Sequence, residues 1–412
     1  MKKFLKSFFN KPSESSKAEF ENGKYMPVKE DPIEERFTYS FTKNGGKFLY
    51  CENKAECDDF FNKMEFYDVK KKAMLAELDK SAVKLENSRI SPDASLRFSE
   101  DEGRLFFGVS PEYQDYAYEN DSTLLDEDRV SLDIWGWQED EIQPMQLKNK
   151  SQEEKKSYLA VLSLKDLRVV QLGTPEVDEV QLENKITKTI ALASTDAPYR
   201  RNYSWDIQIG RDLYLLDLAT GNKALIEKNA SGAARLSPGG NYAYWYDARD
   251  SSWVAYDLKA KVKINLTAAI PVPFYDEIHD SPSLPSSYGA AGWLEGDASF
   301  LINDRFDLWK VDPRNPAAAQ NITAGEGRRT QNAFRRERLK VDEVAIDPKE
   351  PLILSTFDEV TKKSGFYAAN YQGKGLPKEL LFSDHLNYGI RKAENSSQLL
   401  FRRSTYTESP DL

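Results

Sequence analysis

A repeated unit of short strands is the feature that most constrains the fold of this chain. From about residue 90 onward, a short strand is followed by a Ser-Pro or Asp-Pro type of turn, a strand of four to six apolar or aromatic residues, a polar loop and a further strand. From Ile186 on, successive units start roughly 45 to 60 residues apart, the spacing typical of propeller blades. Copies of the unit begin at or near Ser95, Ile186, Ala234, Ala291, Val344 and Ile390.

The repeat predicts an all-β fold. Each unit reads as a small antiparallel sheet that cannot bury both of its faces alone, so neighbouring units must stack radially. We therefore expect a β-propeller of about six to seven blades over residues 91–412, with the last blade incomplete. An all-β sandwich is the alternative. Because the last unit stops before its outer strands, we expect that the polypeptide continues past Leu412, or that a closing strand comes from elsewhere.

The N-terminal part has a different texture. Residues 1–35 are polar and read as a disordered arm. Residues 36–90 read as a small α+β segment with a helical lead-in to the propeller. Within it the pattern predicts a strand over Lys47–Cys51, a short helix over Lys54–Phe66 and a second helical stretch over 69–85.

The charge balance argues against two classes of partner. Lys and Arg number 57 against 67 Asp and Glu, a formal net charge of −10, which disfavours nucleic acid and anionic membrane surfaces as main partners. No stretch approaches the ~20 apolar residues of a membrane span. The basic run 327–340, which includes Phe334, could in principle bind nucleic acid, but a solvated blade edge is the favoured interpretation. The first residues lack the uninterrupted apolar run of a signal peptide, so the chain as written is expected to be cytoplasmic.

Few residues suit metal binding or nucleophilic catalysis. The chain has two cysteines, Cys51 and Cys57, and two histidines, His279 and His385, too few for a disulfide framework, a Cys-rich zinc site or a His-rich metal site. No G-x-S-x-G nucleophile elbow occurs. We therefore expect no metal, no cofactor and no catalytic residue in this chain.

The most conspicuous non-repeating segment is the loop 275–288. Its Asp276, Glu277, His279 and Asp280 could bind a cation or a peptide amino terminus, because carboxylates supply both charge and acceptors. The alternative is that the prolines in and before the loop stiffen a connection between blades.

Tryptophans and acidic residues have simple structural interpretations. We expect the tryptophans in strand-like segments to stack between blades rather than to form a sugar-binding platform. These are Trp135, Trp137, Trp245, Trp253, Trp293 and Trp309. The acidic stretch 112–129 is expected to be a solvated insertion between strands.

Several strings resemble one enzyme family. They are LRFS at 96–99, LDIWGW at 132–137, LSPGGNYAYWYD at 236–247, YDEIHDSPSLPSSYGAAGW at 275–293 and NDRFDLWKVDP at 303–313. Residues from about 72 to 412 resemble the N-terminal propeller of the prolyl-oligopeptidase (S9) serine peptidases, closest to the large branch of Bacteroidetes-type bacteria.

The resemblance implies a division of labour. In that family an α/β-hydrolase domain with a Ser-Asp-His triad follows the propeller, and this chain lacks it. His279 and His385 fall inside propeller units, so no catalytic residue carries over to any position. The implied role is a noncatalytic, substrate-gating propeller whose partners are a peptide substrate and the missing hydrolase domain. For the complete enzyme, the resemblance implies a periplasmic or secreted location.

The first 68 or so residues do not share this resemblance. The string KYMPVKEDPIEERFTYSFTKNGGKFLYCEN at 24–53 resembles the start of the lactate-utilisation (LUD-domain) proteins, which suggests a fused reading frame. Two alternative functions follow. The chain could be a stand-alone propeller that binds a protein or peptide, or, less favoured, a protein related to lactate utilisation.

Overall fold

The computed structural model describes residues 85–410, except 86, 92, 112–133, 184–187 and 341, and the backbone of six strands before them. The chain divides into two compact units, Met1–Ala82 (the N-terminal unit) and Val83–Leu412 (the propeller unit). Among the described residues, no helix is both long enough and apolar enough to cross a membrane. The acidic stretch 112–129 lies outside the described residues.

The N-terminal unit contains strands wherever it is described. A hairpin lies within the expected polar arm and consists of β1 (Ala18–Glu21) and β2 (Lys24–Pro27). A four-stranded antiparallel sheet follows in sequence order, formed by β3 (Arg36–Phe41), β4 (Lys47–Asn53), β5 (Lys63–Asp68) and β6 (Ala73–Asp79). The predicted strand at Lys47–Cys51 is confirmed as part of β4.

The two predicted N-terminal helices are wrong where the structure describes them. β5 occupies the end of the predicted helix Lys54–Phe66, and β6 occupies the middle of the helical stretch 69–85. In the register of this pair, Met64 lies opposite Leu78 and Phe66 opposite Ala76, so apolar residues pair across the strands at a period of two. Short apolar runs fit a helical and an extended period equally well, and here pairing between strands decides. Residues 54–62 lie outside the described part.

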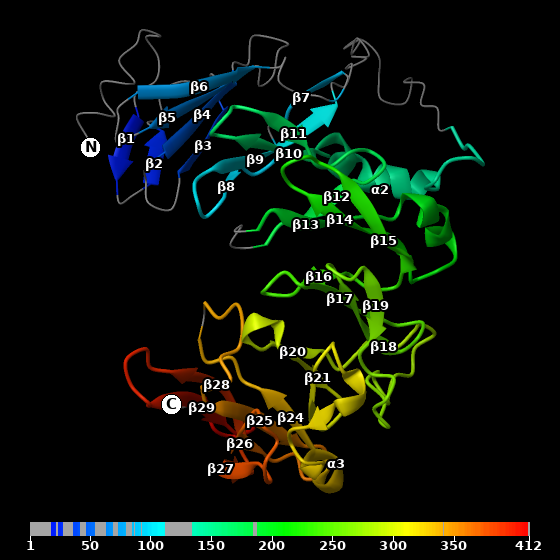
Figure 1. Cartoon of the computed structure of the whole chain (residues 1–412), viewed down its shortest axis with the longest axis vertical. Helices are drawn as coiled ribbons and strands as arrows, with labels where there is room; N and C mark the ends of the chain where they lie inside the picture. Colours follow the sequence, from blue (N-terminus) through cyan, green and yellow to red (C-terminus); the bar gives the residue numbers. More distant parts are fainter. Residues whose placement is uncertain are drawn as a thin grey trace. The chain divides into compact units, whose positions relative to one another are not determined.

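The propeller unit consists of small antiparallel sheets that follow one another along the chain (Figure 1). Sheet A contains β7 (Ser88–Ile90), β8 (Arg97–Phe98), β9 (Arg104–Pro111), β10 (Tyr158–Ser163) and β11 (Val169–Gln171). Sheet B contains β12 (Glu179–Gln181), β13 (Ile190–Thr195), β14 (Arg211–Asp217) and β15 (Lys223–Ala230). Sheet C contains β16 (Arg235–Leu236), β17 (Tyr242–Asp247), β18 (Ser252–Asp257) and β19 (Val262–Asn265).

The later sheets repeat this order. Sheet D contains β20 (Ala290–Trp293), β21 (Phe300–Asn303), β22 (Leu308–Val311) and β23 (Gln320–Asn321). Sheet E contains β24 (Asn332–Arg336), β25 (Leu352–Asp358), β26 (Ser364–Ala369) and β27 (Lys378–Ser383). Sheet F contains β28 (Leu386–Lys392) and β29 (Leu399–Ser404). The helices α2 (Gln143–Glu154) and α3 (Glu326–Thr330) and the 3₁₀ turns η3 (Ala197–Ser204), η4 (Glu295–Asp297) and η5 (Pro316–Ala318) lie in connections.

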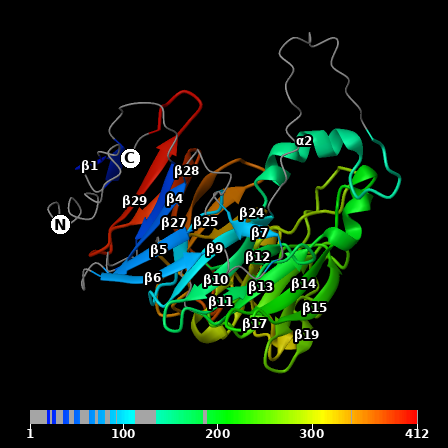
Figure 2. The ribbon, with the colours of Figure 1, turned by 90° about the horizontal axis from the view of Figure 1, so that it is seen from above.

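Buried side chains join each sheet to the next. Figure 2 shows the ribbon of these sheets from above, with β9 to β11 of sheet A followed by β12 to β15 of sheet B. Representative pairs are Phe106 and Leu216 between sheets A and B, Leu213 and Trp245 between B and C, Trp253 and Phe300 between C and D, Leu308 and Phe334 between D and E, and Ile353 and Ile390 between E and F. Burying one such side chain contributes about 1.5–3 kcal/mol. The stacking of neighbouring sheets is therefore the main source of stability in this unit.

Strand β21 shows why the fold is a propeller and not a sandwich. Phe300 and Ile302 belong to the cluster between sheets C and D, whereas Leu301 belongs to the cluster between D and E. Successive strand residues point to opposite faces, so sheet D is buried on both faces against two different neighbours. In a sandwich each sheet packs one face on one partner sheet. The predicted all-β propeller fold is confirmed.

The tryptophans divide into two groups. Trp245, Trp253 and Trp293 are buried between sheets, and the half-buried Trp309 packs against the cluster between sheets C and D, as predicted. Trp135 and Trp137 are 66% and 86% exposed and lie outside any strand, so the prediction that they stack between blades is wrong. Both residues belong to the long connection between β9 and β10. This connection also contains α2, in which no residue is buried. Aromatic content alone does not distinguish such a connection from a strand.

Candidate functional site

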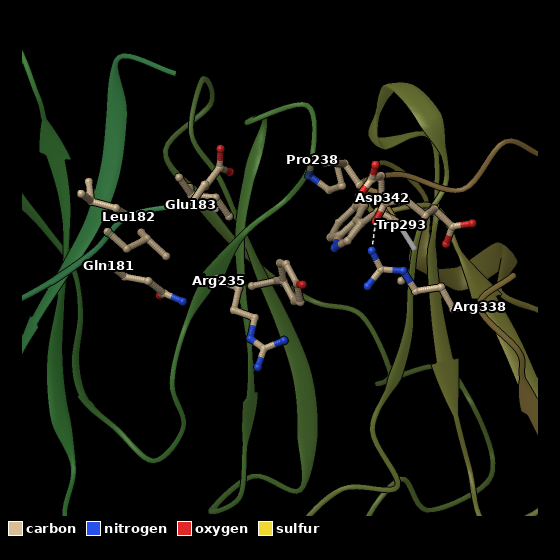
Figure 3. A pocket seen from close by; sticks show the side chains of 14 residues that line it. Gln181, Leu182, Glu183, Arg235, Pro238, Trp293, Arg338 and Asp342 are labelled. Atoms are coloured by element: carbon tan, nitrogen blue, oxygen red, sulfur yellow. Dashed lines mark hydrogen bonds between the residues drawn. The ribbon is translucent and has the colours of Figure 1, made fainter. Parts of the chain in front are cut away.

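A cavity of about 500 Å³ lies where the first strands of sheets B, C and D approach one another (Figure 3). Its wall includes the end of β12 with the residues after it, β16, the end of β20 and the connection that follows β24. The apolar part of the wall consists of Leu182, Leu192, Leu236, Pro238 and Val344. The cavity is therefore built from segments that are far apart in sequence.

Two aromatic side chains, Tyr244 and Trp293, form one part of this wall. Trp293 is buried and stacks on Phe300 with ring centroids 4.7 Å apart, while Tyr244 meets Trp293 edge-on at 5.4 Å. Burial raises the pKa of the Tyr244 hydroxyl above its ordinary value, against the opposing charge of Arg235. The aromatic wall is thus held in place by the packing between sheets C and D.

A glycine next to Trp293 lets the strand adopt the required path. Gly292 has a φ of 122°, a conformation that favours glycine, and the register of β20 against β21 shifts between Ala290 and Gly292. A Cβ at this position would lie 3.1 Å from Cδ1 of Ile346. Gly292 therefore allows close packing at the edge of the cavity.

Charged residues complete the wall. Glu183 pairs with Lys188 at 2.5 Å, and Glu343 accepts two hydrogen bonds of 2.8 Å from the buried guanidinium of Arg336. The guanidinium of Arg338 donates to the carbonyl oxygens of Lys340 and Glu343, at 3.1 and 2.6 Å.

Two further charged residues of the wall, Arg235 and Asp342, are exposed. In the described part of the chain, neither side chain has an ion-pair or hydrogen-bond partner. The guanidinium of Arg235 and the carboxylate of Asp342 can therefore bind a ligand without first breaking a contact within the described part of the protein.

The loop predicted to bind is organised around Tyr288. The Tyr288 hydroxyl donates to Oδ1 of Asp276 at 3.2 Å and accepts a 2.7 Å hydrogen bond from the backbone N–H of Glu277. Oε1 of Glu277 also lies 3.3 Å from the guanidinium of Arg328. Burial, together with the carboxylates of Asp276 and Glu277, raises the pKa of Tyr288 to about 12. These two carboxylates therefore have partners within the protein.

The other two residues predicted to bind a ligand take no part in the hydrogen bonds around Tyr288. Nε2 of His279 lies 3.0 Å from the carbonyl oxygen and 3.1 Å from Oγ of Ser283, and Asp280 is exposed. None of Asp276, Glu277, His279 and Asp280 lines the cavity. The loop precedes β20, whereas the cavity residues lie at the other end of that strand. Among the described residues, no group of three His, Cys, Asp or Glu side chains could hold a metal ion. Ligand binding by the loop stays a prediction.

Several arginines of the basic run 327–340 form contacts within the protein. Arg336 is 7% exposed at its side chain and pairs with Glu343, so the predicted solvated edge is wrong at this position. The Arg335 guanidinium donates to the carbonyl oxygens of Phe334 and Arg305, at 2.7 and 2.9 Å, and lies over the ring of Tyr288. Burial lowers the pKa of Arg335. The expected absence of nucleic-acid and membrane partners stays a prediction, as does the cytoplasmic location.

Neither Arg235 nor Asp342 was among the residues predicted to bind a ligand. Arg235 occupies the first strand of the clearest repeat copy, and first strands line the centre of a propeller, so its position in the repeat was a usable signal. Asp342 lies in an irregular connection where the sequence carries no comparable signal.

No protein-family model matches the chain, and no curated protein matches it. Solved structures do match. A prolyl endopeptidase is 11% identical, with a TM-score of 0.37 over 91% of this chain and 47% of that chain. Porphyromonas gingivalis dipeptidyl peptidase 4 is 11% identical, with a TM-score of 0.41 over 92% of this chain and 51% of that chain. The β-propeller domain of the Trilobed protease from Pyrococcus furiosus is 11% identical, with a TM-score of 0.31 over 91% and 93%.

These structural neighbours are propeller-containing S9-type peptidases at low identity. This chain spans about half the length of the prolyl endopeptidase and the dipeptidyl peptidase. Because the TM-scores lie below 0.5, the fold assignment rests on the sheet topology and packing described above. The expected similarity of the first 68 residues to lactate-utilisation proteins finds no support in these comparisons.

Proposed function

We propose that this chain is a noncatalytic, peptide-binding propeller of the S9 type, whose cavity admits short peptides and excludes folded proteins. The observation that supports the proposal is the cavity formed by the first strands of three successive sheets. Its volume, about 500 Å³, lies within the range of about 300–1,000 Å³ that is typical of small-ligand sites. A folded domain is far too large to enter it.

The chemistry of the wall suits a peptide. Trp293 and the aliphatic side chains supply apolar surface for side chains, and Gln181 and Tyr244 supply polar groups that can bond to peptide amides. The catalytic step would belong to a hydrolase domain outside this chain. The propeller's part would be to select substrates by size and by contacts in the cavity.

One observation favours a second role as a scaffold for another protein. Trp135, Trp137 and Trp205 are all more than half exposed, and they lie in the connections between β9 and β10 and between β13 and β14. An ion pair of 3.5 Å between Asp140 and Arg201 joins these two connections. Exposed aromatic side chains on two connections that contact each other can contribute to a protein-binding surface.

A cavity-filling substitution tests peptide binding. Val344 lines the cavity and is 63% exposed, so Val344→Trp should fill part of the space at little cost to the fold. We expect it to weaken the binding of short fluorescent peptides by about tenfold or more in anisotropy titrations, because the ring occupies ligand volume. The matched control is Val360→Trp, since Val360 is 66% exposed and does not line the cavity.

Two results would contradict the proposal. One is an absence of short-peptide binding by the unmodified chain at millimolar peptide concentration. The other is equal affinity of Val344→Trp and the unmodified chain. Preferential binding of a folded protein, weakened by Trp135→Ser but not by Val344→Trp, would instead establish the scaffold role.

A further inference from the structure

The charges in the cavity wall are unevenly compensated. Glu183 is neutralised by Lys188, and Glu343 by Arg336. In the described part of the chain, the Arg235 guanidinium and the Asp342 carboxylate have no such partner. The guanidinium of Arg338 is already bonded to two carbonyl oxygens. The positive charge of Arg235 and the negative charge of Asp342 are therefore available to a ligand.

These two groups come from different parts of the fold. Arg235 lies on β16 in sheet C, and Asp342 lies in the connection that follows β24 of sheet E. Figure 3 shows their side chains apart, with that of Trp293 between them in this view. A ligand that satisfies both charges must therefore be extended and carry opposite charges at its two ends.

The setting of Arg235 suits a carboxylate. Arg235 lies opposite Tyr244 in the register of β16 against β17, and both residues line the cavity. Its positive charge opposes the rise of the Tyr244 pKa. A guanidinium can bind a carboxylate through two parallel hydrogen bonds, and hydrogen bonds between charged groups are stronger than neutral ones. A concave wall also strengthens the attraction by focusing the field.

A doubly charged anion such as a phosphate satisfies this wall only in part. It can bind to Arg235, but it offers nothing to the carboxylate of Asp342 and is repelled by that charge. A ligand that also carries a positive charge removes this repulsion. The wall thus favours a ligand with one negative and one positive end.

We infer that the cavity takes short peptides in their zwitterionic form, with the free α-carboxylate on Arg235 and the free α-ammonium on Asp342. This inference rests on the proposed peptide-binding function and specifies its ligand. It makes the cavity selective for peptides with uncapped ends over internal segments of a longer chain.

The test compares four forms of one short alanine–phenylalanine peptide, over graded lengths, by isothermal titration calorimetry. The forms are uncapped, N-acetylated, C-amidated and doubly capped. For the unmodified chain, we expect each cap to weaken binding by about tenfold, the usual effect of losing a hydrogen bond between charged groups. Arg235→Gln should bind the acid and the amide equally, while it still distinguishes the free from the acetylated amino terminus. Asp342→Asn should show the converse pattern.

Controls separate the inference from the proposed function. Arg402→Gln changes an exposed arginine of β29 that does not line the cavity, and it should bind all four forms like the unmodified chain. Arg235→Lys keeps the charge and should restore part of the preference for the acid. If all four forms bind equally, the inference is overturned and the proposed function stands. If no form binds, the proposed function itself fails.

Discussion

Asp297 illustrates how one residue can join two sheets. It lies in η4, between β20 and β21, and is 2% exposed. Its carboxylate accepts hydrogen bonds from Oγ of Ser237 and the backbone N–H of Gly239, both at 2.7 Å, and from the backbone and side-chain amides of Asn241, at 3.1 and 2.8 Å. The three residues that supply these four donors belong to the turn between β16 and β17 of sheet C, next to the cavity. Asp297 therefore fixes sheet D against its neighbour.

Replacing Asp297 should lower stability markedly. Asp297→Asn keeps the shape and tolerates the φ of 54°, but it places a donor among donors and removes the charge. We expect a loss of about 2–3 kcal/mol in the free energy of unfolding, measured by urea denaturation. Asp250→Asn, at an exposed turn position, should change it by less than about 0.5 kcal/mol. Equal effects of the two substitutions would contradict this role of Asp297.

At the scale of elements, a buried ion-pair network links sheet A to sheet B. Asp178 lies just before β12 and is 9% exposed at its side chain. Its Oδ2 is 3.1 Å from Nζ of Lys156, which precedes β10, and 2.8 Å from the guanidinium of Arg200 in η3. Burial raises the pKa of Asp178, but the hydrogen bond and charge of Lys156 and the charge of Arg200 outweigh it. The pKa of Asp178 thus lies below its ordinary value of 3.8.

This network predicts a pH dependence of stability. Because the pKa of Asp178 is lower in the folded than in the unfolded state, its contribution is fully present above pH 3.8 and is lost as the pH falls through the folded-state pKa. The difference in free energy of unfolding between the unmodified chain and Asp178→Asn should therefore be largest near neutral pH and shrink below about pH 4. Urea denaturation from pH 7 to pH 3 measures it. A difference that grows on acidification would contradict the assignment.

At the scale of the whole molecule, the propeller unit holds both the described core clusters and the cavity. The five clusters between sheets and all residues of the cavity wall come from Val83–Leu412. A compact unit with its own hydrophobic core can in principle fold alone. The fragment 83–412 should therefore remain folded by circular dichroism and bind short peptides within about twofold of the full chain. A fragment that is folded but does not bind would contradict the assignment of the site to the propeller unit.

Much of the propeller could be predicted from the sequence because its information is local. In β21, three successive apolar residues, Phe300 to Ile302, indicate a strand buried on both faces, and the repetition of such units requires neighbours on both sides. Ser-Pro and Asp-Pro turns mark the ends of the strands, because the conformation of such a turn depends on its own residues. In the N-terminal unit, the local pattern led to a wrong prediction of helices at β5 and β6. Short apolar runs fit both the helical and the extended period, and only the pairing of the strands decides between them.

The candidate site depends on information that a linear pattern does not contain. The sequence by itself determined the all-β repeat, the net negative charge and the scarcity of Cys and His residues. Only the tertiary structure decided that Asp276 and Glu277 bond to Tyr288 within their own loop, while Arg235 and Asp342 share a cavity wall. The physical reason is that the charge of a side chain is available to a ligand only if no partner lies nearby. That depends on which residues the stacking of the sheets brings together across more than one hundred positions of sequence.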